Sequence, residues 1–269
     1  MLSDLRLPGR TSRRFRRGVY LLPSMFTVAN MFCGYACVVY AMRGEFQTAA
    51  PFIGFAIILD MLDGLIARLT GTTSAFGLEF DSLADVISFG LAPAVLTFSW
   101  GLFHLGRLGW AAGFLFVTAA ALRLARFNIQ SVASADRRYF VGLPSPAAAG
   151  VPAATVYAWP YPLEGFPIAV MALAVVLVPA VLMVSTIRFR SFKTLDFGWH
   201  RSYLYLFFIA AVLALVATEP RVILLAAAYG YLVSAPIGLA YSRLRRRSPA
   251  AEPPVVEPAP GPTPSTSPD

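Results

Sequence analysis

The stretch TAAPFIGFAIILDMLDGLIARLTGTTSAFGLEFDSLAD, residues 48–85, contains two apolar segments joined by a short polar connection. The first segment, Thr48–Leu69, is long enough to cross a bilayer, because about 20 helical residues span a hydrocarbon core about 30 Å thick. The second segment begins near Phe80 and continues into the apolar run that ends at Leu102. Because the connection is short, the two segments are expected to form antiparallel neighbouring helices in a membrane.

The composition of the whole chain agrees with a membrane protein. Of its 269 residues, 57% are hydrophobic and 13% are charged, whereas a soluble domain carries about 25% charged residues. We therefore expect an all-α integral membrane protein, a polytopic bundle of about eight transmembrane helices. The expected spans are Leu22–Met42, Thr48–Leu69, Phe80–Leu102, Leu108–Phe127, Pro146–Trp159, Pro167–Ile187, Tyr203–Val216 and Val222–Tyr241. The fifth and seventh are short, so six or seven spans is the alternative.

Basic residues predict the orientation of these helices, because they favour the cytoplasmic side of a membrane. With eight spans and a cytoplasmic N-terminal segment, the outer loops hold only Arg43, Arg107 and Arg221 of the 22 basic residues. Both termini are therefore expected in the cytoplasm, for a multi-pass protein of the cell inner membrane. The net charge of +8 then reflects this bias and an attraction to anionic lipids. The sequence contains no basic soluble domain of the kind that binds nucleic acids.

Four acidic residues lie within the second and third expected spans or at their ends: Asp60, Asp63, Asp81 and Asp85. A charged side chain at mid-membrane costs about 2.5–3.5 kcal/mol on insertion scales, so a cluster of four needs an explanation. The spacing within each pair, three or four residues, places its members on one helix face. Interhelical hydrogen bonds or pairing with Arg68 would be a structural explanation, but one basic neighbour is too few for four acids.

A bound cation accounts for the acids better, because four carboxylates this close cannot remain ionised without one. Oxygen ligands without clustered His or Cys favour Mg²⁺ or Mn²⁺, with Ca²⁺ as a further candidate, over zinc. Small residues on the same faces, Gly64, Ala67 and Gly77, leave room for a ligand or for close helix packing. With Arg68 one turn away, a phosphate-bearing ligand is favoured, because phosphoryl chemistry needs cations to neutralise charge.

The pattern Asp60-x2-Asp63-Gly64-x2-Ala67-Arg68-x8-Gly77-x3-Asp81-x3-Asp85 resembles the signature of CDP-alcohol phosphatidyltransferases at all eight positions. The resemblance implies a six-helix core, a homodimer, and a cavity open to the cytoplasm and the bilayer. It also implies two divalent metal ions among the aspartates, with Asp60, Asp63 and Asp81 as ligands and Asp85 as both ligand and general base. The CDP-lipid site implied by the resemblance is lined by Asp63, Gly64, Ala67, Arg68 and Gly77.

Three further stretches resemble the bacterial phosphatidylserine synthases within that family: residues 22–34, 122–128 and 142–150. They imply that the chain moves the phosphatidyl group of CDP-diacylglycerol onto L-serine, giving phosphatidylserine and CMP. The expected serine-binding residues are Arg123, Arg126 and Asn128, because arginine can hold a carboxylate with two hydrogen bonds. Plain anchoring on the cytoplasmic side is the alternative for the arginines. Ser145 is expected to cap the helix that starts there.

Two other functions remain open at this point. A transferase of the same family could use another acceptor, such as glycerol 3-phosphate or an inositol phosphate, which would need an additional basic pocket. A divalent-cation transporter could also use intramembrane carboxylates, and such proteins often show inverted repeats and broken helices near the midplane. Here the acids are confined to one helix pair at the cytoplasmic end, with Arg68 beside them, and a transport site would not need that arginine.

The chain divides into three parts by composition. Residues 1–20 form a basic cytoplasmic segment, and residues 21–242 form the transmembrane catalytic domain. Residues 243–269 are first basic and then rich in proline, so we expect a disordered tail.

Overall fold

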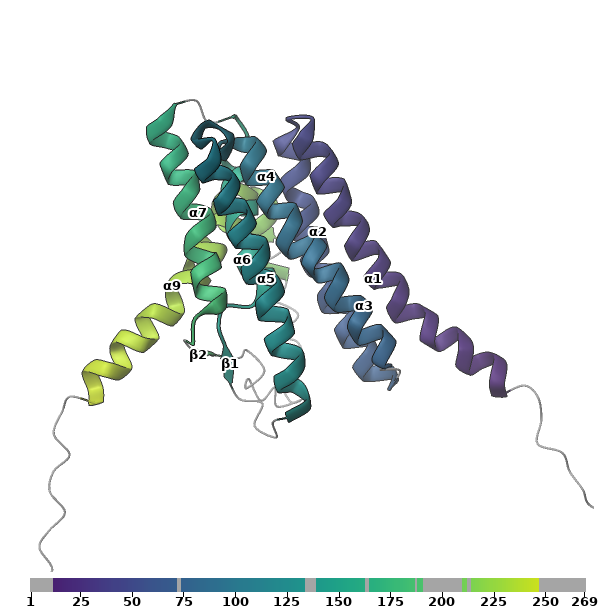
Figure 1. Ribbon diagram of the computed structural model, residues 1–269. Helices are drawn as coiled ribbons and strands as arrows, with labels where there is room; N and C mark the ends of the chain where they lie inside the picture. Colours follow the sequence, from purple (N-terminus) through teal and green to yellow (C-terminus); the bar gives the residue numbers. More distant parts are fainter. Residues whose placement is uncertain are drawn as a thin grey trace, which may run out of the picture.

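Long apolar helices make up most of the chain, as the computed structural model shows (Figure 1). The structure describes residues 12–71, 74–133, 139–162, 165–186, 188–190, 210–211 and 214–246. The helices are α1 (Ser12–Met42), α2 (Phe46–Thr70), α3 (Ala75–Asp85), α4 (Ala92–Trp100), α5 (Arg107–Ala133), α6 (Ser145–Ala158), α7 (Phe166–Val184) and α9 (Pro220–Arg246). A π-helix, η1 (Val86–Leu91), joins α3 to α4, and a 3₁₀ helix, η2 (Leu102–Leu105), follows α4.

Within the described residues, four helical segments are long and apolar enough to cross a membrane: Met25–Met42, Phe46–Leu69, Ala75–Trp100 and Arg107–Ile129. Two apolar helices are shorter, Ala169–Val184 and Pro220–Ser234. Helix α6 has 14 residues, which is about 21 Å of helix and less than the hydrocarbon thickness.

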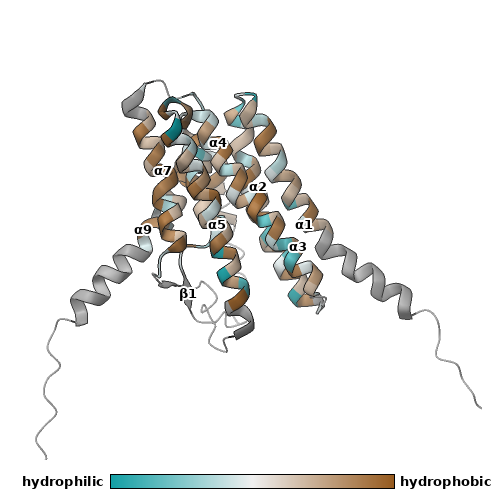
Figure 2. Ribbon diagram, in the orientation of Figure 1, coloured by the Kyte–Doolittle hydropathy of each residue, from teal (hydrophilic) through white to brown (hydrophobic). Residues whose placement is uncertain are grey.

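These helices confirm the predicted helical membrane fold, and Figure 2 shows hydrophobic residues along them and hydrophilic residues mainly towards their ends. The count of eight spans stays a prediction. Most of the seventh expected span, Tyr203–Val216, lies outside the described residues.

Helix α1 is the common neighbour of the segments that carry the aspartates. It packs against α2, α3, η1 and α4. Its contact with α2 uses small side chains that are almost completely buried, including Ala41, Ala49 and Ala56. Small residues suit this position, because lipid tails are as apolar as the side chains and helix association then depends on close van der Waals packing.

The predicted reversal between the second and third spans is present as the turn from α2 to α3. Helix α2 ends at Gly71, which adopts the left-handed conformation (φ 63°) and donates its N–H to the carbonyl oxygen of Ala67. Helix α3 begins after Ser74, whose hydroxyl oxygen accepts a 3.0 Å hydrogen bond from the Gly77 N–H. This capping bond satisfies one of the free N–H groups at the helix start.

A short antiparallel ladder connects the region before α6 to the region after α7. Strands β1 (Tyr139–Val141) and β2 (Arg188–Arg190) pair with Phe140 opposite Phe189, and they are the only β structure in the described parts of the chain. The ladder continues through the N–H of Leu143, which donates to the carbonyl oxygen of Leu182 at 3.0 Å. These contacts fix the start of α6, and with it Ser145, relative to α7.

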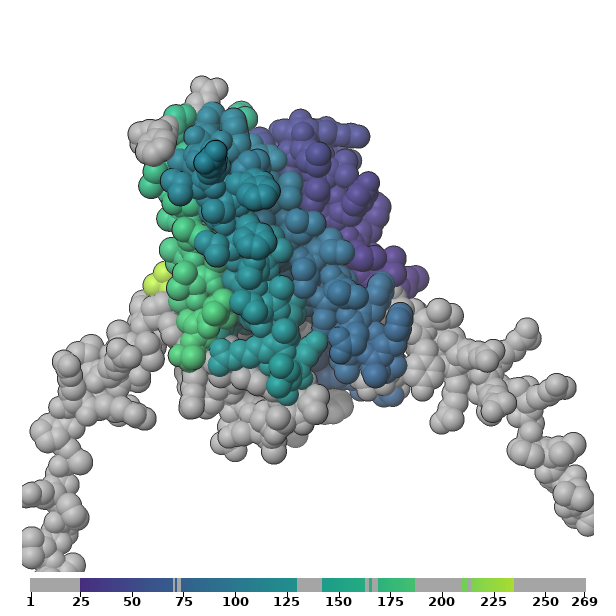
Figure 3. Space-filling view, in the orientation of Figure 1, coloured from purple at the N-terminus to yellow at the C-terminus, as the bar shows by residue number. Residues whose placement is uncertain are grey.

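The first and the last described helices have their outer ends on the same side of the bundle. Figure 1 shows the N-terminal end of α1 and the C-terminal end of α9 at the same end as the turn between α2 and α3. The chain termini themselves lie outside the described residues, so their location stays a prediction. Figure 3 shows α5 in the middle of one face, between α7 and α3.

Candidate functional site

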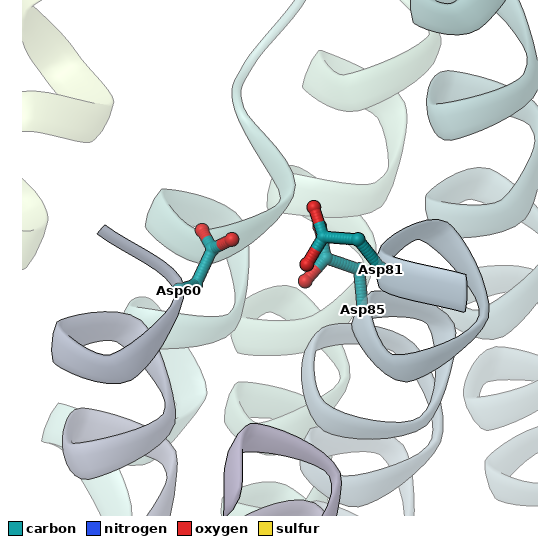
Figure 4. Close-up of side chains that lie close together, drawn as sticks. All are labelled: Asp60, Asp81 and Asp85. Atoms are coloured by element: carbon teal, nitrogen blue, oxygen red, sulfur yellow. The ribbon is translucent and has the colours of Figure 1, made fainter. Parts of the chain in front are cut away.

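Three of the four predicted aspartates come together between two helices. Asp60 extends from α2, and Asp81 and Asp85 extend from α3 (Figure 4). One carboxylate oxygen from each residue lies within 4.8 Å of those of the other two. The helical spacing therefore places the pair on α3 toward Asp60, as the sequence predicted.

The fourth aspartate, Asp63, lies outside this group of three. It is 6% exposed, and its Oδ2 accepts a hydrogen bond from the hydroxyl of Thr27 on α1. It interacts electrostatically with Asp60 and Asp81. Asp63 thus belongs to the same acidic region, and its role as a metal ligand stays a prediction.

The three grouped carboxylates suit a divalent cation. They repel one another across a short distance, and Asp81 Oδ1 is buried without a hydrogen-bond partner in the described part of the chain. A buried oxygen without a partner is costly, and a cation would satisfy it. The ligands are all hard oxygen atoms, which favours Mg²⁺, Mn²⁺ or Ca²⁺.

Arg123 is the basic side chain that the structure brings to these acids. It extends from α5 and interacts electrostatically with Asp85 and Asp60. Its Nη1 donates a 2.7 Å hydrogen bond to the hydroxyl oxygen of Ser145, and its guanidinium lies 5.5 Å from the ring centre of Phe127. The guanidinium is therefore held in place at the edge of the acidic cluster.

The contact with Arg123 corrects the expected role of Ser145. The residue before it, Pro144, occupies the N-cap position of α6, and no side chain forms a capping hydrogen bond there. Ser145 is instead the first helical residue, and its fully buried hydroxyl accepts from Arg123. The prediction that Ser145 caps the helix is wrong, because Pro144 already sets the extended entry.

The other residues expected to bind serine lie further along α5. Asn128 Nδ2 donates a 2.9 Å hydrogen bond to the hydroxyl of Ser82 on α3, next to Asp81. Arg126 is half-buried on the same helix. Both roles in serine binding stay predictions.

The residues expected to line the CDP site follow the aspartates along α2 and α3. Gly64 lies beside Arg68, since a Cβ at Gly64 would be 3.5 Å from Arg68 Nη1. Arg68 itself is exposed near the end of α2, and Ala67 is half-buried. Gly77 lies in the first turn of α3, where its N–H forms the cap with Ser74. Their contact with CDP stays a prediction.

Helix α1 contributes polar contacts that the sequence analysis missed. Asn30 Nδ2 donates to Asp85 Oδ1 at 3.2 Å, and the Asn30 carbonyl oxygen accepts from the Ser88 hydroxyl at 2.9 Å. Thr27, three residues before Asn30, holds Asp63. Thr27 and Asn30 are two polar residues on one face of an apolar span, and this pattern could have indicated their contact with the acids. Both lie in residues 22–34, one of the stretches that resemble phosphatidylserine synthases.

A second missed residue is Tyr231 on α9. It is half-buried and interacts electrostatically with Arg123. Helix α9 is anchored nearby by a 2.9 Å hydrogen bond between the hydroxyls of Tyr229 and Thr155 on α6. The hydropathy of this late helix did not indicate that it lies beside Arg123.

The π-helix η1 begins immediately after Asp85. At its end, the N–H of Ala92 bonds to the carbonyl oxygen of Ile87, five residues earlier. The next residue, Pro93, has no N–H and therefore cannot form the regular bond to the residue four positions before it. Such wide turns are rare and often occur at functional sites. Within the predicted span Phe80–Leu102, Pro93 is the residue that could have indicated this wide turn.

Comparison with known proteins agrees with this geometry. The sequence model of CDP-alcohol phosphatidyltransferase matches residues 20–186. The chain is 41% identical over 199 residues to the CDP-diacylglycerol–serine O-phosphatidyltransferase of Helicobacter pylori strain J99, covering 72% of this chain and 82% of that protein. It is 33% identical over 127 residues to the Bacillus subtilis protein of the same name, covering 47% and 70%. It is also 35% identical over 170 residues to the archaetidylserine synthase of Methanothermobacter thermautotrophicus, covering 62% and 69%.

Proposed function

Since this chain belongs to the CDP-alcohol phosphatidyltransferase family, we propose that it transfers the phosphatidyl group of CDP-diacylglycerol to L-serine. The products are phosphatidylserine and CMP, so the protein is an enzyme of phospholipid biosynthesis. The observation that carries this proposal is the convergence of Asp60, Asp81 and Asp85 on one site in a helical membrane protein. Carboxylates with this spacing are the part of the family signature that performs the chemistry.

Serine is the acceptor that the relatives support. The bacterial relatives are named for transfer to serine, and the archaeal relative is also named as a serine-lipid synthase. These names favour serine over glycerol 3-phosphate or an inositol phosphate. Membership of the family likewise favours a transferase over the cation-transporter alternative.

The metal ions are held by Asp60, Asp81 and Asp85 in this proposal, with Asp63 as the remaining ligand. Two bound Mg²⁺ or Mn²⁺ ions, or Ca²⁺, would neutralise the charge of the pyrophosphate and of the leaving phosphate. The buried, unpartnered Asp81 Oδ1 supports this assignment. The electrostatic interaction of Asp63 with Asp60 and Asp81 supports including it as a ligand.

Asp85 is the proposed general base. Its Oδ1 accepts the hydrogen bond from Asn30, and in this proposal the other oxygen, Oδ2, accepts the proton of the serine hydroxyl. The serine oxygen forms a bond to the phosphorus attached to diacylglycerol, and the bond from that phosphorus to the CMP oxygen breaks. A base is needed because a neutral hydroxyl is a weak nucleophile near pH 7.

The two substrates are bound by different basic residues in this proposal. Arg68, with Gly64, Ala67 and Gly77 beside it, binds the CDP portion of the lipid. Arg123 binds the serine carboxylate, because its guanidinium lies beside Asp85 and Ser145 already holds one of its nitrogens. Arg126 and Asn128 complete the serine site from the same helix.

The position of the protein in the cell follows from its charge pattern and its family. We place it in the cell inner membrane with both termini and the active site facing the cytoplasm, where soluble serine and CMP are handled. The basic end of α1 and the basic end of α9 lie on the same side of the bundle (Figure 1), which supports this orientation. A homodimer is proposed from the family resemblance.

The experiment that tests the function is turnover of the purified protein in detergent. CDP-diacylglycerol and Mg²⁺ or Mn²⁺ are supplied with labelled serine, glycerol 3-phosphate or inositol, and CMP release is measured in parallel. Label should enter the lipid from serine only, and a chelator should stop both signals. Transfer to another alcohol would replace serine as the acceptor, and no CMP release with any acceptor would contradict the transferase assignment.

A further inference from the structure

The contact between Asn30 and Asp85 gives α1 a role in the reaction. We propose that Asn30 is a positioning residue that holds the Asp85 carboxylate in the orientation needed to accept the serine proton. The inference rests on the proposed function, because it concerns the base of that reaction.

The first support is the geometry of the hydrogen bond. Asn30 Nδ2 lies 3.2 Å from Asp85 Oδ1, and the two residues are 0% and 7% exposed. An amide that donates to a carboxylate makes a charge-assisted bond, which is stronger where water is excluded. With Oδ1 held, rotation of the carboxylate is restricted, so the direction of Oδ2 is set before the substrate arrives. Proton transfer depends steeply on such alignment.

The second support is that Asn30 is itself held against the segment that follows Asp85. Its carbonyl oxygen accepts a 2.9 Å hydrogen bond from the hydroxyl of Ser88, which is fully buried in η1. One turn further along α1, Gly34 allows the two backbones to approach closely, since a Cβ there would lie 2.8 Å from Ser88 Cα. Asn30 and Asp85 are therefore parts of one packed unit.

The third support is that the amide is costly to bury. Asn30 Oδ1 has no hydrogen-bond partner in the described part of the chain, and a buried polar atom without a partner destabilises a fold. Leucine has a similar size and would avoid this cost. The amide at this position is thus better explained by what it does for Asp85 than by stability.

Asn30→Leu separates these two explanations. We expect kcat to fall by about 10- to 100-fold, while the KM values for CDP-diacylglycerol and serine stay within about threefold of wild type. The Mg²⁺ concentration that gives half-maximal activity should also stay within about threefold. The thermal unfolding midpoint in detergent should change little, because the lost hydrogen bond to Asp85 is offset by removal of the unpartnered Asn30 Oδ1. If Asn30→Leu does not fold, Asn30→Ala is judged by the same kinetic criteria.

The matched control is Cys37→Ala. Cys37 lies seven residues along the same face of α1, is fully buried, and packs in the apolar core. The Cys37→Ala variant should be slightly less stable than wild type, and its kcat should be unchanged.

Two results would overturn the inference. The first is a kcat of Asn30→Leu within about threefold of wild type. The second is a loss of activity explained by weaker binding of a substrate or of Mg²⁺, which would make Asn30 part of a binding site. The proposed function has a separate test in the same experiment, because it fails only if the wild-type protein itself releases no CMP from CDP-diacylglycerol and serine.

Discussion

Replacing Gly34 by alanine should separate α1 from η1, the π-helix that directly follows Asp85. The Cβ of alanine would lie 2.7 Å from Ser88 Oγ and 2.8 Å from Ser88 Cα, whereas ordinary van der Waals contact is 3.4–4 Å. The side chain of Ser88 could rotate away, but its Cα cannot, so η1 and α1 must move apart by roughly 1 Å.

The size of the effect follows from two opposing contributions. Overpacking a tight contact costs about 1–3 kcal/mol, and replacing glycine within a helix gains up to about 1 kcal/mol. The protein should therefore lose about 0–3 kcal/mol of unfolding free energy. A displacement near 1 Å in a catalytic group can lower the rate by on the order of 10², so we expect kcat to fall by about 10- to 100-fold.

The matched control is Gly54→Ala on α2. Gly54 is exposed within a helix, and a Cβ there would have no atom within 4 Å. Serine-dependent CMP release and thermal unfolding in detergent are measured for both variants. Gly54→Ala should match wild type in CMP release and unfold at the same or a slightly higher temperature. If Gly34→Ala also kept wild-type CMP release, the close packing of α1 on η1 would not hold the site.

The remaining predictions concern the residues of the proposed mechanism. Asp85→Asn should lower turnover by about 10²–10⁴-fold, the range for loss of a general base, while labelled CDP-diacylglycerol still binds; loss of binding as well would make Asp85 chiefly a ligand. Asp81→Ala should raise the Mg²⁺ concentration for half-maximal activity by at least about tenfold, because it removes one of three grouped ligands, and an unchanged metal titration would contradict that role. Arg123→Lys should raise the KM for serine by about tenfold and leave that for CDP-diacylglycerol nearly unchanged, because lysine lacks the two-pronged donor geometry. Steady-state kinetics with each substrate varied in turn would show whether the defect falls on serine.

Helix positions and the grouping of the acids could be predicted from the sequence because both depend on short-range periodicity. The second span was expected at Thr48–Leu69, and α2 runs from Phe46 to Thr70. The spacing on α3 placed Asp81 and Asp85 on one face, and the short connection brought that face to Asp60. Asp63, which the spacing also put beside Asp60, instead bonds to Thr27 of α1. The spacing of the acids alone was compatible with several cation-dependent functions. Only the family resemblance selected phosphatidyl transfer among them.

Contacts between individual side chains of different helices could not be predicted in this way. Asn30 meets Asp85 across 55 positions of sequence, and Arg123 meets Ser145 across 22. Such pairs depend on how helices rotate and cross, which hydropathy does not encode. Ser145 shows the same limit, because a serine at a helix start is a capping residue by local rules and becomes a partner of Arg123 only in the folded bundle.

The wide turn of η1 has a consequence for which sequence changes this protein can accept. A regular helix turns by about 100° for each residue, so losing one residue between Asp85 and Pro93 would rotate the two acids of α3 by that angle relative to α4. The hydropathy of the segment would hardly change, and neither would any side chain of the site. Proteins that share this chemistry should therefore vary freely in the apolar residues of the segment while keeping its length constant.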